Sequence, residues 1–305
     1  MHTLRDFSPG RLIEGGAELI GLNHPLWISL AQTFGLAFCV VTPEEDVDQL
    51  GLEMPLYLQG ELLSRDDAKK VWAELGDALD GLDRPARSVH PYRPWDSPDA
   101  RLLDERPLSD WLDTLNVSTM CRAALEAQFA DNNLEPTRCQ SYLANLALVR
   151  GGGGKRFWTD SEMFRCATGN DSLAWKLHAW LESNEPSSVF LGNPVTAISI
   201  SDSSVSVKTA GGTDTYDYVV LAIPPSLWSD RMKIDPAIPP EYEMHMGPAV
   251  KFLSSVSERF WLERRLSPSG MDERIGETWE GPDNQTVLDD QGIEHDYEAL
   301  LAAVD

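Results

Sequence analysis

Two stretches of the chain hold residues whose types and spacing could do chemistry. The first, Glu14-Gly-Gly-Ala-Glu-Leu-Ile-Gly-Leu-Asn-His-Pro-Leu-Trp27, places three glycines around the carboxylate of Glu18 and runs into a helix predicted to begin near Pro25. Glycine has no Cβ atom, so such a loop lets the backbone approach a large flat molecule, and the carboxylate adds a polar contact. The same pattern is also typical of a loop that only packs tightly, and both interpretations stay open.

The second stretch, Met246-Gly-Pro-Ala-Val-Lys-Phe-Leu253, places Lys251 in an apolar run with the pattern of a strand. Because side chains alternate along a strand, Lys251 points away from the face of Val250 and Phe252. One interpretation is a lysine on a solvated face. The other is a partly buried amine with lowered proton affinity, or one that holds an ordered water.

Other catalytic and metal-binding motifs are missing from the sequence. It contains no G-x-S-x-G, HExxH or P-loop pattern, and the glycine run 151–154 is interpreted as a connector. The six histidines and four cysteines have no metal-ligand spacing. We therefore expect no metal site, and we expect the cysteines to be reduced thiols.

The formal net charge of −24 argues against nucleic-acid partners and anionic membrane surfaces. The acidic surface could attract cationic substrates such as amines, or it could serve solubility or salt tolerance. No apolar run reaches the roughly 18 residues of a membrane-spanning helix. The N-terminus has no basic-then-apolar export signal, so we expect a cytoplasmic protein.

Helical and strand patterns alternate along the chain and predict an α/β fold with mixed helices and strands. Ser64 and Asp67 predict a helix start, while Gln59-Gly60 and Gly211-Gly212 predict hairpin turns. Further helices are predicted over 109–116, 118–131 and 136–149, and strands over 37–41, 164–167, 195–201, 205–209, 214–216, 218–223 and 250–256.

Four segments, taken together and in this order, resemble the flavin-containing monoamine oxidase family. They are the loop Glu14–Pro25, Phe164-Arg-Cys-Ala-Thr-Gly-Asn-Asp-Ser-Leu-Ala174, Tyr218-Val-Val-Leu-Ala-Ile-Pro-Pro225 and Gly247-Pro-Ala-Val-Lys251, which leads into Phe260-Trp261. The resemblance implies a partial, Rossmann-like FAD-binding domain (residues 1–55 and 162–240). This domain is interleaved with a helical and mixed-sheet substrate-binding domain (residues 56–161 and 241–305).

The resemblance also implies which residues form the site. The loop that contacts the flavin ring falls on Gly16, Ala17, Glu18 and Leu19, and the valine on the adenine side falls on Val195. The family's lysine, which holds a water beside flavin N5, falls on Lys251 as the catalytic residue. Glu18, Tyr142 and Leu146 are the predicted substrate contacts.

The chain departs from the family pattern in three ways. It begins after the G-x-G-x-x-G motif and ends before the C-terminal FAD segment, so we expect a partial chain. Thr168 stands where a glycine is usual. Leu19 stands where amino-acid oxidases place a carboxylate-binding arginine, which favours amines over amino acids.

The implied activity is FAD-dependent oxidation of a small primary or secondary amine by O₂, giving an imine or aldehyde and H₂O₂. One alternative is an L-amino-acid oxidase or another flavoprotein oxidoreductase on the same scaffold. Another is a non-catalytic truncated or split chain that binds FAD only with a complementing chain or as a homo-oligomer. An apolar strand such as the one predicted over 218–223 needs neighbouring strands on both sides. We therefore expect the isolated chain to aggregate or to bind a partner tightly.

Overall fold

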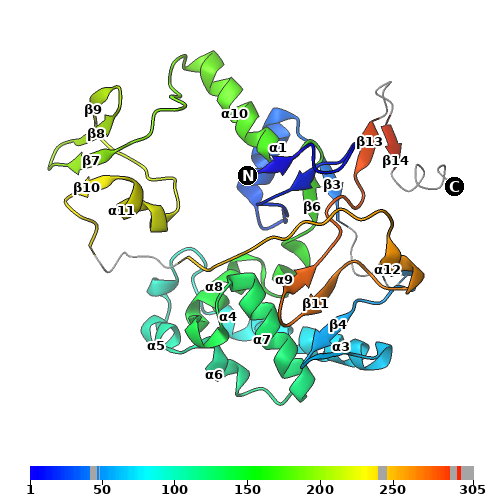
Figure 1. Ribbon diagram of the computed structural model, residues 1–305. Coiled ribbons are helices and arrows are strands. Elements are labelled where there is room, and N and C mark those ends of the chain that lie inside the picture. Colours follow the sequence, from blue (N-terminus) through cyan, green and yellow to red (C-terminus); the bar gives the residue numbers. More distant parts are fainter. Residues whose placement is uncertain (42–46, 48, 240–245, 289–293, 297–305) are drawn as a thin grey trace. The chain divides into compact units, whose positions relative to one another are not determined.

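The computed structural model describes residues 1–41, 47, 49–239, 246–288 and 294–296 (Figure 1). Its contacts divide the chain into two compact units. Unit 1 comprises Met1–Lys176 and Ala249–Asp305, and unit 2 comprises Leu177–Pro248. The mixture of helices and mixed sheets confirms the predicted α/β class. The predicted division into a cofactor domain and a substrate domain is a division by role, and it stays a prediction.

The helices of unit 1 begin where small polar residues can cap them. Ser64 accepts a hydrogen bond from the backbone N–H of Asp67 and Ser118 accepts one from Cys121, as N-caps do. Ser141 caps Ala144 in the same way, so the helix predicted over 136–149 begins only at Tyr142. The described helices are α1 (Pro25–Phe34), α3 (Arg65–Asp80), α4 (Asp83–Ala86), α5 (Ala100–Glu105), α6 (Leu108–Leu112), α7 (Thr119–Asn133), α8 (Tyr142–Gly151), α9 (Phe157–Asp160) and α12 (Phe260–Glu263).

Short strands in unit 1 bring distant parts of the chain together. In the sheet ordered β12-β11-β4-β5, β11 pairs in parallel with β4, although more than 200 residues separate them. Gln59 and Gly60 have positive φ angles of 53° and 81°, and they form the predicted hairpin turn between β4 and β5. The strands are β1 (Thr3–Leu4), β2 (Ile13–Glu14), β3 (Phe38–Val40), β4 (Leu56–Leu58), β5 (Glu61–Leu62), β6 (Phe164–Cys166), β11 (Gly270–Asp272), β12 (Gly276–Thr278), β13 (Thr286–Leu288) and β14 (Glu294–Asp296).

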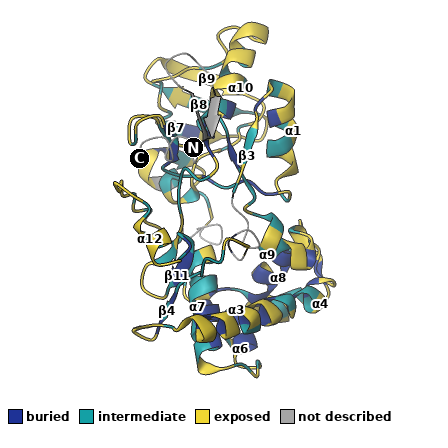
Figure 2. Cartoon of the chain, turned by 90° about the vertical axis from the view of Figure 1, so that its right-hand side faces the viewer, coloured by how far each residue is buried: buried dark blue, intermediate teal, exposed yellow. Residues whose placement is uncertain are grey.

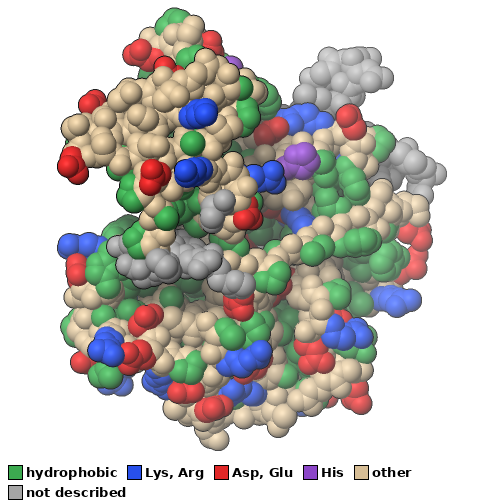
Figure 3. Space-filling model, turned by 60° about the vertical axis from the view of Figure 1, so that its left-hand side comes forward, with side chains coloured by type: hydrophobic (Ala, Val, Ile, Leu, Met, Phe, Trp, Pro, Cys, Tyr) green, Lys and Arg blue, Asp and Glu red, His purple; other side chains and the backbone are tan. Residues whose placement is uncertain are grey.

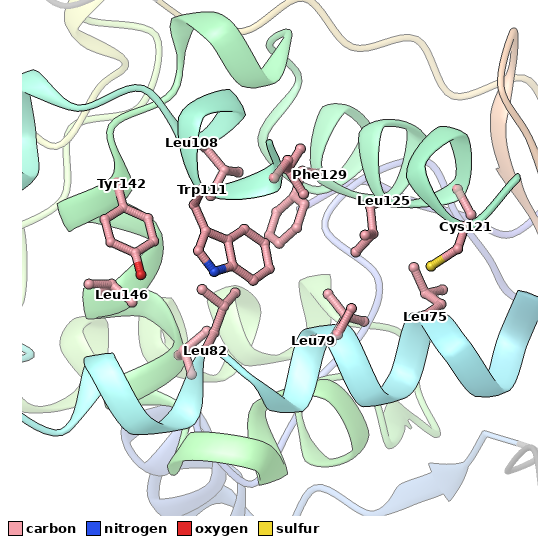
Figure 4. Close-up of a cluster of buried hydrophobic side chains, with 14 of the residues drawn as sticks. Leu75, Leu79, Leu82, Leu108, Trp111, Cys121, Leu125, Phe129, Tyr142 and Leu146 are labelled. Carbon is pink, nitrogen blue, oxygen red and sulfur yellow. The ribbon is translucent and has the colours of Figure 1, made fainter. Parts of the chain in front are cut away.

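The core of unit 1 lies among its helices. α3, α6, α7 and α8 turn their apolar faces toward one another, and Figure 2 shows their buried residues on these inner faces. In the close-up of Figure 4, the ring of Trp111 lies between Phe129 and Tyr142. Leu125 of α7 is fully buried in the same cluster.

Unit 2 is built on one four-stranded sheet with the order β10-β7-β8-β9. β7 (Ala197–Ile200), β8 (Val205–Thr209) and β9 (Gly212–Tyr216) form an antiparallel meander, and β10 (Lys233–Asp235) pairs with β7 in parallel. Gly212 has a φ of 144° at the predicted hairpin turn. Helix α10 (Asp171–Asn184) begins in unit 1 and continues into unit 2, which also contains α11 (Trp228–Arg231).

Two predicted strands are not formed. Residues 218–223 and 250–256 pair with no strand in the described part of the chain. Tyr218 and Val220 are 89% and 88% exposed, and Val250 and Phe252 are 94% and 87% exposed. An apolar run becomes a strand only where a neighbouring strand supplies its ladder hydrogen bonds, and the described residues supply none here.

On the face shown in Figure 3, acidic side chains are scattered among basic and apolar ones and form no single patch. Within the described residues, we find no helix with the length and apolar character needed to cross a membrane.

The packing around Leu125 predicts a large cost for truncating this side chain. Leu125→Ala should lower the free energy of unfolding by about 2–5 kcal/mol, because it leaves a cavity in a fully buried cluster. Leu102→Ala on α5 is the control: this side chain is 68% exposed, and the change should stay within about 0.5 kcal/mol. Urea unfolding of both variants measures the difference, and equal effects would contradict the assignment of the core.

Glu14 is a buried carboxylate at the end of β2. It is 4% exposed, accepts hydrogen bonds from Thr3 Oγ1, and accepts one from the backbone N–H of Asn170 at 2.7 Å. Burial raises the pKa of the Glu14 carboxyl above its ordinary value, although these hydrogen bonds lower it in part. The folded chain therefore binds this proton more tightly than the unfolded chain does.

This raised pKa predicts a pH-dependent difference between the wild type and Glu14→Gln. Stability contributed by protonated Glu14 is present below the ordinary pKa and is lost as the pH rises through the raised one, whereas glutamine does not titrate. The free energy of unfolding of Glu14→Gln relative to wild type should thus increase between about pH 4 and about pH 8. Urea unfolding at both pH values tests this, with the exposed Glu61→Gln as control; a difference that is independent of pH would contradict it.

Candidate functional site

The glycine loop leaves the short β1–β2 ladder and ends on β6. The backbone N–H of Gly15 donates to the His2 carbonyl, and the N–H of His2 donates to the Gly16 carbonyl, both at 2.7 Å. At the other end, Ile20 forms an isolated bridge with Phe164 of β6. Both ends of the loop are therefore fixed by backbone hydrogen bonds, and the residues between them are held in place.

The three glycines of this loop serve different purposes. A Cβ atom on Gly15 would collide with His2, and one on Gly21 would collide with Asn23 and the backbone of Asp160 and Ser161. A Cβ atom on Gly16 would meet nothing within 4 Å, yet Gly16 has a φ of 143°, where side chains are strained. Two glycines thus serve packing inside the protein, while Gly16 presents an open backbone face.

The side chain of Asn170 forms hydrogen bonds with the backbone in the middle of the loop. Its Nδ2 donates to the carbonyls of Ala17 (2.8 Å) and Glu18 (2.7 Å), while its Oδ1 accepts from the backbone N–H of Cys166 at 3.2 Å. Asn170 is 2% exposed, so these bonds are protected from water.

The carboxylate of Glu18 is the centre of a buried network. Oε1 accepts from Arg165 Nε at 2.6 Å, and both carboxylate oxygens lie within reach of Trp279 Nε1, at 3.0 and 3.1 Å. Oε2 forms an ion pair with Lys251 Nζ. The Glu18 side chain is 6% exposed, so its charge is balanced by these donors and not by water.

Arg165 lies on the inner side of this network. It stands at the centre of β6, where its register partner on β3 is Cys39, and its side chain is buried. Besides Glu18, it forms an ion pair with Asp283 and donates to the carbonyl of Glu280 at 3.2 Å. The guanidinium therefore joins the glycine loop to the segment after Trp279.

Lys251 points inward while its neighbours point outward. Its ammonium lies against Glu18 and 4.9 Å from the centre of the Trp279 ring, within cation–π range, while Val250 and Phe252 are exposed. The predicted alternation is present, but the lysine faces the protein. Its side chain is 23% exposed, so it is partly buried and does not lie on a solvated face.

Glu18, Lys251 and Trp279 line a cleft in unit 1 with a volume of about 1150 Å³. Its lining is mostly apolar and aromatic, including Ile13, Phe252, Phe260, Trp261, Leu266 and Trp279. Two ion pairs, Lys251–Glu18 and Arg259–Glu280, lie in its wall. Burial raises the pKa of the Glu280 carboxyl, and its hydrogen bond from Arg259 opposes that rise. Among the described residues, no cluster of His, Cys, Asp and Glu could hold a metal ion.

The structure brings some predicted site residues together and leaves others apart. Glu18 and Lys251 are in contact, and Gly16, Ala17 and Leu19 lie in the loop around Glu18. Tyr142 and Leu146 do not line the cleft, because both are buried in the helical core. Val195 belongs to unit 2, just before β7. The roles predicted for all of these residues stay predictions.

Sequence reasoning missed Arg165, Trp279, Asn170 and Asp283. The one available signal was Arg165, a charged residue in the apolar run Phe164-Arg-Cys-Ala167, because an arginine inside a strand needs an acidic partner.

Comparisons with known proteins match the chain to one family. The family model described as flavin containing amine oxidoreductase matches residues 1–292. AofH from two strains of Mycobacterium tuberculosis, whose name places it among the flavin-containing monoamine oxidases, is 28% identical over 190 residues. The match covers 59% of this chain and 40% of AofH.

Two solved structures share the fold. A putrescine oxidase redesigned in its cofactor binding has a TM-score of 0.71 and 22% identity, over 89% of this chain and 61% of that chain. Cyclohexylamine oxidase from Brevibacterium oxydans IH-35A has a TM-score of 0.68 and 20% identity, over 90% and 61%. This chain thus spans less than two thirds of the length of the proteins it matches. Because the family model covers nearly all of this chain, the protein belongs to the flavin-containing amine oxidoreductase family, whose cofactor is a flavin.

Proposed function

We propose that this chain is an FAD-dependent amine oxidase that acts in the cytoplasm on a small primary or secondary amine. The observation that carries the proposal is the placement of the Lys251 amine on Glu18, two residues from the open backbone face of Gly16. In the net reaction, the amine, O₂ and water give an aldehyde, ammonia or a smaller amine, and H₂O₂. The names of the similar proteins, putrescine oxidase and cyclohexylamine oxidase, support the choice of amines.

The loop residues fit a flavin. Gly16 has a backbone conformation that disfavours side chains and an open face, as a flat ring in contact with the backbone requires. Gly16, Ala17, Glu18 and Leu19 would lie against the ring. A bound flavin supplies the acceptor for the hydride that leaves the carbon next to the amine nitrogen.

The chain's own residues would orient the reactants. The Lys251 ammonium has three N–H donors, of which Glu18 takes one, so another can hold a water at the cleft. We place the substrate in this cleft, and not beside Tyr142 and Leu146.

Amino acids fit the cleft less well. Their carboxylate would need a cation, but the cations that line the cleft already have partners: Lys251 is paired with Glu18, Arg259 with Glu280, and Arg11 donates to the Gln285 carbonyl. Leu19, in the loop predicted to contact the flavin, adds no cation.

A second candidate is a chain that binds FAD only together with a complementing chain. The high exposure of the apolar residues Tyr218, Val220, Val250 and Phe252 favours it, because such surface is usually covered by a partner.

Flavin binding and peroxide release test the two candidates. The purified chain, mixed with FAD and gel-filtered, should retain the visible absorption of bound flavin, and it should release H₂O₂ with amines but not with amino acids. A colourless, self-associated chain would support the second candidate. Peroxide release with amino acids alone would overturn the choice of amines.

Replacement of Lys251 tests its role. In the flavin-loaded protein, Lys251→Met should slow flavin reduction or reoxidation by roughly tenfold or more, because the positioned water is lost. Lys69→Met on α3 is the matched control on an exposed helix face and should leave both rates unchanged. Unchanged rates in Lys251→Met would remove this residue from the reaction.

A further inference from the structure

We propose that Glu18 and Arg165 position Lys251, and that Glu18 is therefore not a receptor for the substrate's ammonium group. Arg165 fixes the Glu18 carboxylate from the inner side, and Glu18 fixes the Lys251 ammonium at the cleft. The inference deepens the proposed function, on which it depends only for the reaction that Lys251 then serves.

The first argument is the occupancy of the Glu18 oxygens. Three donors from three segments converge on them: Arg165 Nε, Trp279 Nε1 and Lys251 Nζ. A substrate ammonium would have to displace one of these donors. Displacing Lys251 would leave this partly buried cation without its carboxylate, and displacing Arg165 would break one of the two ion pairs of a buried guanidinium; both are unfavourable.

The second argument is the anchoring of Arg165. Its side chain is 4% exposed, and it binds Asp283 and the Glu280 carbonyl on one side and Glu18 on the other. The guanidinium is planar, with its donors in a fixed fork, so these acceptors also fix its orientation. Because Nε of Arg165 donates to Oε1 of Glu18, the other oxygen, Oε2, faces Lys251.

The third argument is the order of the charges. Along the contacts, Lys251, Glu18, Arg165 and Asp283 alternate in sign, so each inner charge has an opposite charge on both sides. Lys251 is the outer end of this row, with 23% of its side chain exposed at the cleft. Because Arg165 and Asp283 fix the buried end of this row, the Lys251 amine at the exposed end is held in one position.

Competitive acylation of the lysines tests this positioning. The purified chain is treated with a trace of acetic anhydride, and peptide mass spectrometry gives the labelling of Lys251 relative to the exposed Lys155. An amine held by a carboxylate and an aromatic ring reacts slowly. Glu18→Gln should raise the ratio roughly tenfold, the size of effect expected for losing one charge-assisted contact. Arg165→Met should raise it too, and Arg165→Lys should raise it less.

The control is Arg5→Met, which removes the exposed ion pair with Asp171 in the same unit and should leave the ratio unchanged. If Arg165→Met only unfolds the chain, the labelling of every lysine rises together, and Glu18→Gln and Arg165→Lys then decide. An unchanged ratio in Glu18→Gln overturns the proposal. A rise in Glu18→Gln with none in either Arg165 variant removes Arg165 from it.

A kinetic comparison separates positioning from substrate binding. In the flavin-loaded protein, Glu18→Gln should lower kcat with little change in KM, whereas a substrate receptor would raise KM. A raised KM with an unchanged kcat overturns the assignment of Glu18. The labelling experiment needs neither flavin nor amine, so its result stands even if the chain proves not to oxidise amines.

Discussion

The burial of the Glu18 carboxylate is the constraint on which the rest of the site depends. A carboxylate removed from water needs donors close by, and here they come from three segments far apart in the sequence. Arg165 stands on β6, Trp279 follows β12, and Lys251 lies in an extended segment that has no strand partner among the described residues. Loss of a single partner in such a network typically costs about 3–5 kcal/mol, which explains how one side chain can fix three segments.

The segment around Lys251 shows how far a sequence pattern leads. Alternation correctly places Lys251 on one face and Val250 and Phe252 on the other. Alternation does not tell which face contacts the protein. Hydrophobicity alone would bury Val250 and Phe252 and expose Lys251, which is the opposite of the observed arrangement. The decisive factor is Glu18, more than 230 residues earlier, since a buried carboxylate attracts the amine more strongly than water retains it.

Local features of the fold were predictable because their causes are local. The Ser64 cap, the Gln59-Gly60 turn and the Gly211-Gly212 turn depend on residues within a few positions of one another. The prediction of a strand over 218–223 was wrong, because a strand forms only where a neighbouring strand supplies its hydrogen bonds. Arg165 and Asn170 were missed as site residues for the same reason: their partners are about 120 to 150 residues distant in the chain.

The glycine loop unites the two interpretations that its sequence left open. Gly15 and Gly21 are needed because the protein's own atoms fill the space of a side chain, which is the packing interpretation. Gly16 is different: it has a conformation that disfavours side chains, and it has nothing in front of it. The packing of the first two fixes the loop, and a fixed loop can present Gly16 and the Glu18–Lys251 pair to a ligand without ordering itself at the moment of binding. Tight packing is therefore the means by which this loop becomes a preorganised contact surface.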